Sequence, residues 1–215
     1  MEAAVSHPRT APALAAAVLL LTATACTTDG TATRDAPTPA AAVAVTGPLC
    51  AALPTGSEPG NPTFLAGQPA DAALTWMPTL TTFEAALRTS GALTDLDTTG
   101  GITILAPTDD AFAAMFSDDT WDTLMTRDHQ KLRTLVNAHL IAGAHTADDL
   151  ATAGTTRTLD GTTLTVTRTG PSIRLGDKAD TVCADYQATG ARIHIIDAVL
   201  GPLPATADGT GHRAH

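Results

Sequence analysis

Apolar residues at helical spacing are concentrated in the first half of the chain. Thr81-Thr-Phe-Glu84 has the form of a capping box, in which Thr81 caps a backbone N–H and Glu84 reaches back. The apolar positions that follow predict a helix as far as Gly91. A second and more strongly amphipathic segment starts at Asp128, and the residues that share its apolar face are Leu132, Leu135, Val136, His139 and Leu140. This spacing predicts a helix that Gly143 closes and that points His139 inward.

The second half of the chain has the period-two pattern of strands. Leu164 and Val166 alternate with threonines after Asp160-Gly161, which predicts a hairpin at that turn. Further strands are predicted at Ser172–Leu175, Val182–Gln187 and Arg192–Ile196, and an earlier buried strand at Ile102–Ala106, before a Thr108 cap. Thr146 to Asp149 resembles a short capping box. Early helices and late strands indicate an α+β fold.

The ends of the chain have no pattern of a packed domain. Residues 1–25 are predicted to be a signal peptide of the lipoprotein type, because a short apolar run leads to Ala23-Thr-Ala-Cys26, a sequence similar to a lipobox. Cys26 is then the lipid anchor; the alternative is cleavage by ordinary signal peptidase and plain secretion. Residues 26–46 are predicted to be a flexible tether, 47–204 the domain, and 205–215 a disordered tail.

Composition and charge narrow the class of partner. Hydrophobic residues make up 44% of the chain but aromatics only 3%, which predicts a core of Leu, Ile, Val and Ala and no aromatic platform for bases or sugars. Lys and Arg number 12 against 22 Asp and Glu, so the net charge is −10. Because affinity for phosphate backbones depends on Lys and Arg, nucleic acid is not an expected partner.

The three cysteines fit an exported protein. If Cys26 carries lipid, Cys50 and Cys183 remain as an even pair in an oxidising compartment and are expected to form a disulfide. The alternative is two free buried thiols. No CxxC motif or Cys/His pair has zinc spacing, so no metal or cofactor is expected.

The sequence contains few candidates for catalysis or metal binding. Neither G-x-S-x-G, S-x-x-K nor a P-loop occurs, and the histidines lie in no catalytic motif. An acidic group offers oxygen ligands for calcium, but it lacks EF-hand spacing and is better explained as carboxylates at helix starts; its members are Asp109, Asp110, Asp118, Asp119 and Asp122. We therefore expect no enzymatic activity.

Several segments resemble the motifs of fasciclin domains in the same order. They are Thr81 to Leu87, Ile102 to Phe112, Asn137 to Ile141, and Ala191 to Pro204. The chain is most similar to secreted single-domain fasciclin proteins and lipoproteins of mycobacteria, which share Gly47-Pro-Leu-Cys50 and Val182-Cys183. The resemblance implies a wedge of two β-sheets with helices packed along one side, and it also implies the bond between Cys50 and Cys183.

The resemblance further implies a role in adhesion without known chemistry. The family commonly has Tyr-His where this chain has Ala138-His139, and this departure makes it unsafe to carry over the integrin binding linked to that pair in animal members. Asn137, Ala138 and His139 are the candidates for partner binding, although a histidine on an apolar face is more often a core residue. We expect a monomeric, lipid-anchored, extracytoplasmic protein that binds a matrix or envelope protein or glycan. The alternatives are an envelope carrier of a lipid or glycan and, less favoured, an envelope hydrolase.

Overall fold

The computed structural model describes residues 44–93 and 100–207. The predicted signal peptide, the Cys26 anchor, most of the tether and the tail from residue 208 lie outside these residues. Within them, no helix is long and apolar enough to cross a membrane.

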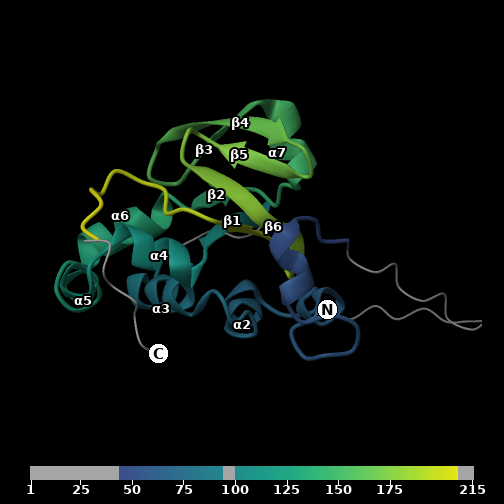
Figure 1. Cartoon of the computed structure of the whole chain (residues 1–215), viewed down its shortest axis with the longest axis horizontal. Coiled ribbons are helices and arrows are strands. Elements are labelled where there is room, and N and C mark those ends of the chain that lie inside the picture. Colours follow the sequence, from purple (N-terminus) through teal and green to yellow (C-terminus); the bar gives the residue numbers. More distant parts are fainter. Residues whose placement is uncertain (1–43, 94–99, 208–215) are drawn as a thin grey trace, which may run out of the picture. The chain divides into compact units, whose positions relative to one another are not determined.

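Helices and strands alternate unevenly along the chain (Figure 1). The helices are η1 (Pro48–Ala52), α1 (Pro62–Leu65), α2 (Ala70–Thr75), α3 (Thr81–Ser90), α4 (Asp109–Met115), α5 (Asp118–Thr126), α6 (His129–Asn137) and α7 (Ala147–Ala153). The strands are β1 (Ile102–Pro107), β2 (Leu140–Ala142), β3 (Thr155–Arg157), β4 (Thr163–Thr169), β5 (Ser172–Leu175), β6 (Ala179–Ala188) and β7 (Ala191–Ile196). The described residues therefore form the mixed α+β fold that the sequence predicts.

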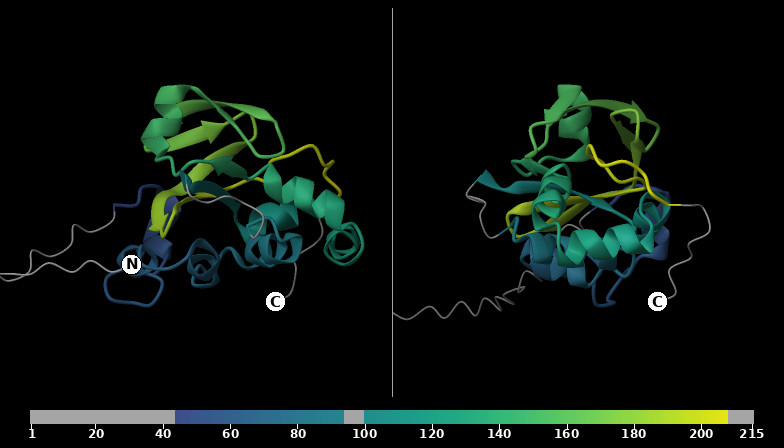
Figure 2. Two further views of the ribbon diagram at one scale, coloured as in Figure 1. Left: turned by 180° about the vertical axis from the view of Figure 1, so that it is seen from behind. Right: turned by 90° about the vertical axis from the view of Figure 1, so that its left-hand side faces the viewer.

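The expected pair of separate sheets is replaced by one sheet of seven strands in the order β2-β1-β7-β6-β5-β4-β3. β1 and β7 are parallel, and the other neighbouring strands are antiparallel. β6 joins the two halves because its first residues pair with β5 while the rest pairs with β7. Register shifts on either side of Cys183 bend β6. The two halves of the sheet therefore differ in orientation while β6 still connects them (Figure 2).

Helices pack against both halves of the sheet, not along one side only. The larger core lies between the sheet and α2 to α6. Within it Phe112 is in ring contact with Phe83, Phe116 and Trp121. A smaller core lies under α7, where Leu150 belongs to the same cluster as Val166, Ile173 and Leu175. Four of the seven aromatic residues are thus gathered at one place, Phe64 and Trp76 form a separate pair, and aliphatic side chains fill most of the rest.

The N-terminus of α3 is capped by a residue from elsewhere in the chain. The Thr81 and Thr82 N–H groups donate to the Asp109 carboxylate, at 3.3 and 2.7 Å, and the Thr81 hydroxyl donates to it at 2.9 Å. The predicted local capping box is therefore wrong, because the Asp109 carboxylate of α4 accepts the free N–H groups at the start of α3 in its place. In contrast, the predicted Thr108 cap and the Thr146–Asp149 capping box are confirmed.

The amphipathic helix α6 is shorter than its apolar pattern predicts. It ends at Asn137, so His139 follows the helix, and Leu140 begins strand β2 instead of a further turn. Leu140 pairs with Ile104 of β1, and hydrogen bonding within the sheet therefore replaces the continuation of the helix. The predicted strand at β1 and the hairpin around Asp160-Gly161 are confirmed.

A disulfide joins Cys50 in η1 to Cys183 in β6. Beside it, Thr46 forms a short antiparallel bridge with Ala184, with N–H to O distances of 3.1 and 2.7 Å in the two directions. The N-terminal segment is therefore attached to the middle of the sheet both covalently and by backbone hydrogen bonds.

Removing this disulfide is expected to destabilise the domain. The bond closes a separation of 133 residues, and such a constraint on the unfolded chain contributes about 2 to 5 kcal/mol. The C50A/C183A double variant should lose that free energy of unfolding in urea titrations, and reductant should lower the stability of the wild type but not of the variant. Equal stability of variant and oxidised wild type would contradict this assignment.

Candidate functional site

His139 is fully buried and makes two hydrogen bonds to backbone groups. Its Nε2 accepts the N–H of Leu200 at 2.9 Å, and its Nδ1 lies 2.8 Å from the Leu135 carbonyl oxygen. Because a carbonyl only accepts, Nδ1 carries the proton and the ring is neutral. The ring also stands edge-on to Phe83, with centroids 5.7 Å apart. His139 therefore ties the end of α6 to the segment after β7.

The structure does not bring the predicted partner-binding residues together at an exposed surface. Ala138 is 2% exposed and His139 is 0% exposed. Asn137 is half-buried, and its carbonyl accepts the Asp160 N–H at 3.3 Å. The apolar α6 face and the backbone of Leu200 enclose the ring, in agreement with the core-residue alternative, and partner binding by this segment stays a prediction.

Burial lowers the pKa of His139 from 6.5 to about 4, because the charged form would lose its hydration. The Leu135 carbonyl and the more distant Asp160 carboxylate partly oppose this shift. The neutral ring is thus the form that the fold selects at neutral pH.

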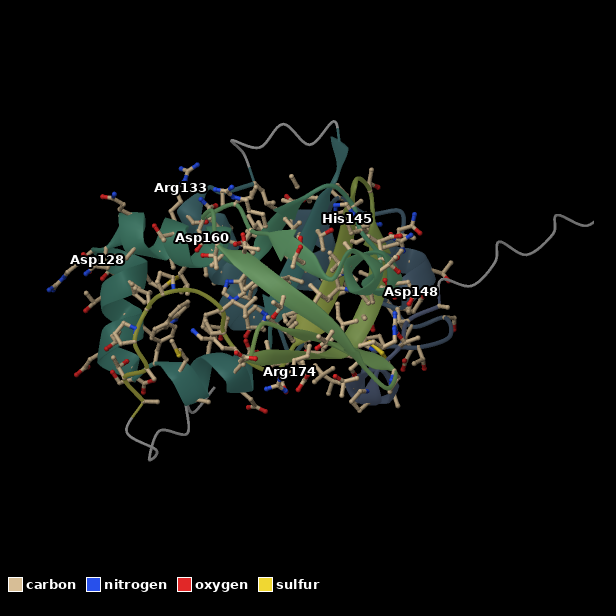
Figure 3. All side chains as sticks on the ribbon, turned by 90° about the horizontal axis from the view of Figure 1, so that it is seen from above. Asp128, Arg133, His145, Asp148, Asp160 and Arg174 are labelled. Atoms are coloured by element: carbon tan, nitrogen blue, oxygen red, sulfur yellow. A yellow bond between two sulfur atoms is a disulfide. The ribbon has the colours of Figure 1, made fainter. Side chains whose placement is uncertain are left out.

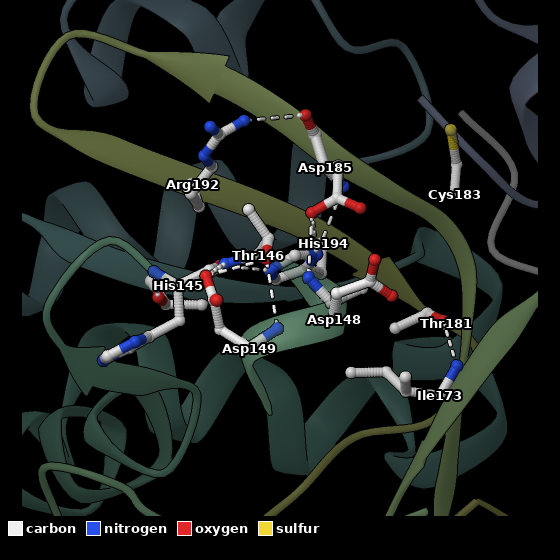
Figure 4. Close-up of polar contacts among 12 residues, drawn as sticks. His145, Thr146, Asp148, Asp149, Ile173, Thr181, Cys183, Asp185, Arg192 and His194 are labelled. Atoms are coloured by element: carbon white, nitrogen blue, oxygen red, sulfur yellow. Dashed lines mark hydrogen bonds and ion pairs between the residues drawn. The ribbon is translucent and has the colours of Figure 1, made fainter. Parts of the chain in front are cut away.

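A second polar cluster surrounds the buried His194, where β6, β7 and α7 meet (Figure 4). Nδ1 of His194 accepts the Asp185 N–H at 3.2 Å, and Nε2 lies 3.0 Å from the His145 carbonyl oxygen. The Asp185 carboxylate accepts the Ala147 N–H at the start of α7, at 2.9 Å. Burial lowers the pKa of His194, so this ring is neutral as well.

Asp185 holds an uncommon backbone conformation within this cluster. Its φ is 72°, the left-handed region, and it is the only described residue other than glycine with a positive φ. It lies between two residues of β6 at the register shift between Cys183 and Tyr186. Two contacts hold this conformation: the Asp185 N–H donates to His194 of β7, and its carboxylate accepts the Ala147 N–H at the start of α7.

An apolar groove lies between α2 and α3 beside the start of β7. Its volume is about 520 Å³. Leu74, Leu87 and Ile102 contribute to its lining, and the ion pair of Glu84 with Arg88, at 2.7 Å, lies at its edge. A groove of this size and polarity is in the range of small-ligand sites. Sequence reasoning missed it because its lining comes from four segments that are separated along the chain.

Most of the acidic residues that the sequence offered as calcium ligands lie at the starts of helices. Residues 44–93 and 100–207 contain no group of three or more His, Cys, Asp or Glu that could hold a metal ion. Of the proposed calcium ligands, Asp109 caps α3, Asp110 lies in the first turn of α4, and Asp118 and Asp119 lie in the first turn of α5. These carboxylates thus serve helix N-termini, where negative charge is stabilising.

Comparison with known proteins identifies the class of this fold. Residues 78–202 match the family described as the fasciclin domain. The match spans more than half of the chain, and the chain therefore belongs to the fasciclin domain family.

The chain is similar to curated proteins of bacteria and mammals. Immunogenic protein MPB70 of Mycobacterium bovis and immunogenic protein MPT70 of Mycobacterium tuberculosis are each 36% identical over 174 residues, which cover 76% of this chain and 86% of the relative. Transforming growth factor-beta-induced protein ig-h3 of Sus scrofa is 34% identical over 124 residues, 58% of this chain but only 18% of that protein. A solved FAS1 domain pair from the insect cell adhesion molecule Fasciclin I is 24% identical, covers 56% of this chain and 44% of that chain, and has a TM-score of 0.44.

The buried histidines predict a loss of stability in mild acid. An unfolded histidine has a pKa near 6.5, whereas His139 binds a proton in the folded state only near pH 4. Between these values the unfolded state binds more protons, so the free energy of unfolding falls as the pH falls, by up to about 3 kcal/mol from His139. His194 acts in the same direction.

Urea titrations at several pH values from 7.5 to 4.5 test this expectation. The H139Q variant, whose amide cannot be protonated, should lose less stability on acidification than the wild type, whatever its stability at neutral pH. The same pH slope for both proteins would show that His139 does not contribute. Asp149 and Asp160 do not contribute to the pH dependence in this range. Their pKa values lie below that of an ordinary aspartate, and an ordinary aspartate already titrates below pH 4.5.

Proposed function

We propose that this protein is a non-enzymatic surface-binding module of the bacterial envelope, attached to the membrane by lipid on Cys26 and mediating adhesion to envelope or matrix components. The main support for the proposal is that the chain belongs to the fasciclin domain family. Its resemblance to that family implies a role in adhesion. The disulfide supports an extracytoplasmic location, because such bonds persist in oxidising compartments.

The chemistry of the described residues is consistent with binding without catalysis. The buried rings of His139 and His194 are each hydrogen-bonded to backbone groups and shielded from water. Neither is positioned as a base beside a nucleophilic hydroxyl or thiol. A role for these rings in stability leaves recognition to the exposed surface.

The α2–α3 groove favours a second candidate, a carrier of a small apolar ligand such as a lipid. Its lining is mainly aliphatic and its volume is about 520 Å³. Native mass spectrometry of the exported protein would show a stoichiometric bound ligand if this candidate is right, and an apo mass alone would count against it.

Adhesion is tested with beads that carry the purified lipid-free chain. We expect them to adhere to bacterial envelope or host matrix preparations more strongly than beads that carry an unrelated domain of the same net charge. Equal adhesion by both kinds of bead would refute the proposal, because the acidic charge alone would then explain the contact.

The lipid anchor is tested by the C26A variant in an actinobacterial or other lipoprotein-processing host. The wild type should be found in the membrane fraction and take up labelled fatty acid, whereas C26A should be released and unlabelled, because a thioether to diacylglycerol needs the Cys26 sulfur. C50A/C183A serves as the matched control, since it also removes cysteines but should keep the label. Unchanged membrane association of C26A would exclude this anchor.

A further inference from the structure

The outer side of the β3–β4 hairpin is formed almost entirely by threonine side chains, each of which carries a hydroxyl group. The residues that share it, called here the hydroxyl face, are Thr155, Arg157, Thr163, Thr165, Thr167 and Thr169. The pairing register places Thr155 opposite Thr165 and Arg157 opposite Thr163. All six residues are exposed.

The strand period explains why the two sides of the hairpin differ. Alternate residues of β4 point to opposite sides, so Leu164 and Val166 are turned to the core under α7 while the threonines are turned to solvent. β5 extends the face, since Arg174 pairs opposite Thr167 and Ser172 opposite Thr169. The result is a sheet surface without a helix over it, held rigid by hydrogen bonds in the sheet.

Among the described residues, several threonines elsewhere in the domain use their hydroxyls in protein hydrogen bonds, and the threonines of the hydroxyl face do not. Buried Thr158 donates to the Asp160 carboxylate and the Thr162 carbonyl, and the helical Thr123 donates to the Asp119 carbonyl. Within residues 44–93 and 100–207, the threonine hydroxyls of the hydroxyl face make no hydrogen bond to protein. Each is therefore available as one donor and an acceptor with two lone pairs.

Charge on and around the face limits what it can bind. Arg174 is neutralised by Asp180, whose carboxylate lies 2.7 Å from its guanidinium. Arg157 makes no ion pair with any residue in the part of the chain that the structure describes, which leaves one cation here in a chain whose net charge is −10. Charged side chains elsewhere include Asp128 and Arg133 on one side of the molecule and Asp148 on the other (Figure 3).

A polyanion would meet repulsion from the whole domain and find a single uncompensated cation. A neutral polymer that is rich in hydroxyl groups would not be repelled by the acidic domain. Its hydroxyls can donate to and accept from the threonine hydroxyls, and they can accept from the Arg157 guanidinium. The threonines repeat about every 6.8 Å along a strand and about 4.8 Å between strands, which gives an extended ligand many simultaneous contacts.

We propose that the hydroxyl face binds a neutral polysaccharide chain laid along β4. The inference rests on the proposed function and names a binding face and partner class for it. No aromatic residue lies on the face to stack on sugar rings, so each contact is weak. Several tethered copies on one surface would raise the overall affinity through multivalency.

The test measures retention of the full chain on gels that contain dextran, mannan or, as the charged comparison, alginate. T165V/T167V removes two hydroxyls but keeps the shape and the strand preference. T123V/T126V replaces two exposed threonines of α5, whose hydroxyls donate to the Asp119 and Asp122 carbonyls, and so controls for the loss of exposed threonines outside the face. We expect retention by at least one neutral gel, weakened about tenfold in T165V/T167V and unchanged in T123V/T126V, since each lost hydrogen bond contributes about 0.5 to 1.5 kcal/mol. Retention should persist at raised ionic strength.

Three results would overturn the proposal: no retention by either neutral gel, equal retention of the two double variants, or retention by alginate alone. Unchanged urea midpoints establish that T165V/T167V is folded. The bead assay separates this inference from the proposed function. If T165V/T167V beads adhere as strongly as wild type, the module binds through another surface, whereas a wild type that does not adhere removes the proposed function itself.

Discussion

Strand β6 is the element on which the rest of the fold depends. It is the one strand that pairs with β5 at its start and with β7 along its remainder, so both halves of the sheet are defined by its path. Cys183 fixes its middle to η1, and the Ala184 backbone pairs with Thr46 next to that bond. Asp185 then turns the strand with a left-handed residue. The cross-link, the Thr46 bridge and the left-handed turn thus occur at three consecutive residues, and the last of them also binds the start of α7.

Several polar side chains form hydrogen bonds between segments that are distant along the chain. His139 connects α6 to the segment after β7, and His194 connects β7 to both β6 and the turn before α7. Asp109 connects α4 to the N-terminus of α3. Where the backbone group is buried, as the Leu200 N–H is, losing its side-chain partner costs more than the hydrogen bond itself, because the group is then left unsatisfied.

This use of polar residues inside the domain has a functional consequence. The histidines that a search for chemistry would select are committed to stability, and the exposed surface carries threonines, scattered charges and an apolar groove. Such a surface is suited to many weak contacts. A module that is tethered and repeated on a cell surface can use weak contacts, because the copies act together.

Local patterns predicted much of this structure correctly. The strand at β1, the Asp160-Gly161 hairpin, the Thr108 cap and the Thr146–Asp149 capping box depend on residues close together in sequence, and the cysteine count indicated the one disulfide that is present. The sequence also indicated the α+β class, since helical and strand periods occupy different halves of the chain.

What the sequence did not determine are the features that depend on distant partners. The cap of α3 was missed because Asp109 lies 28 residues away, and α6 was predicted too long because Leu140 gains a sheet partner in Ile104. The joining of the sheet through β6 and the groove likewise arise only when remote segments pack together, and so does the hydrogen bond of His139 to the Leu200 N–H, although the sequence predicted that this ring points inward. A periodic pattern shows which side of an element is apolar, but only the tertiary structure decides which neighbour covers it.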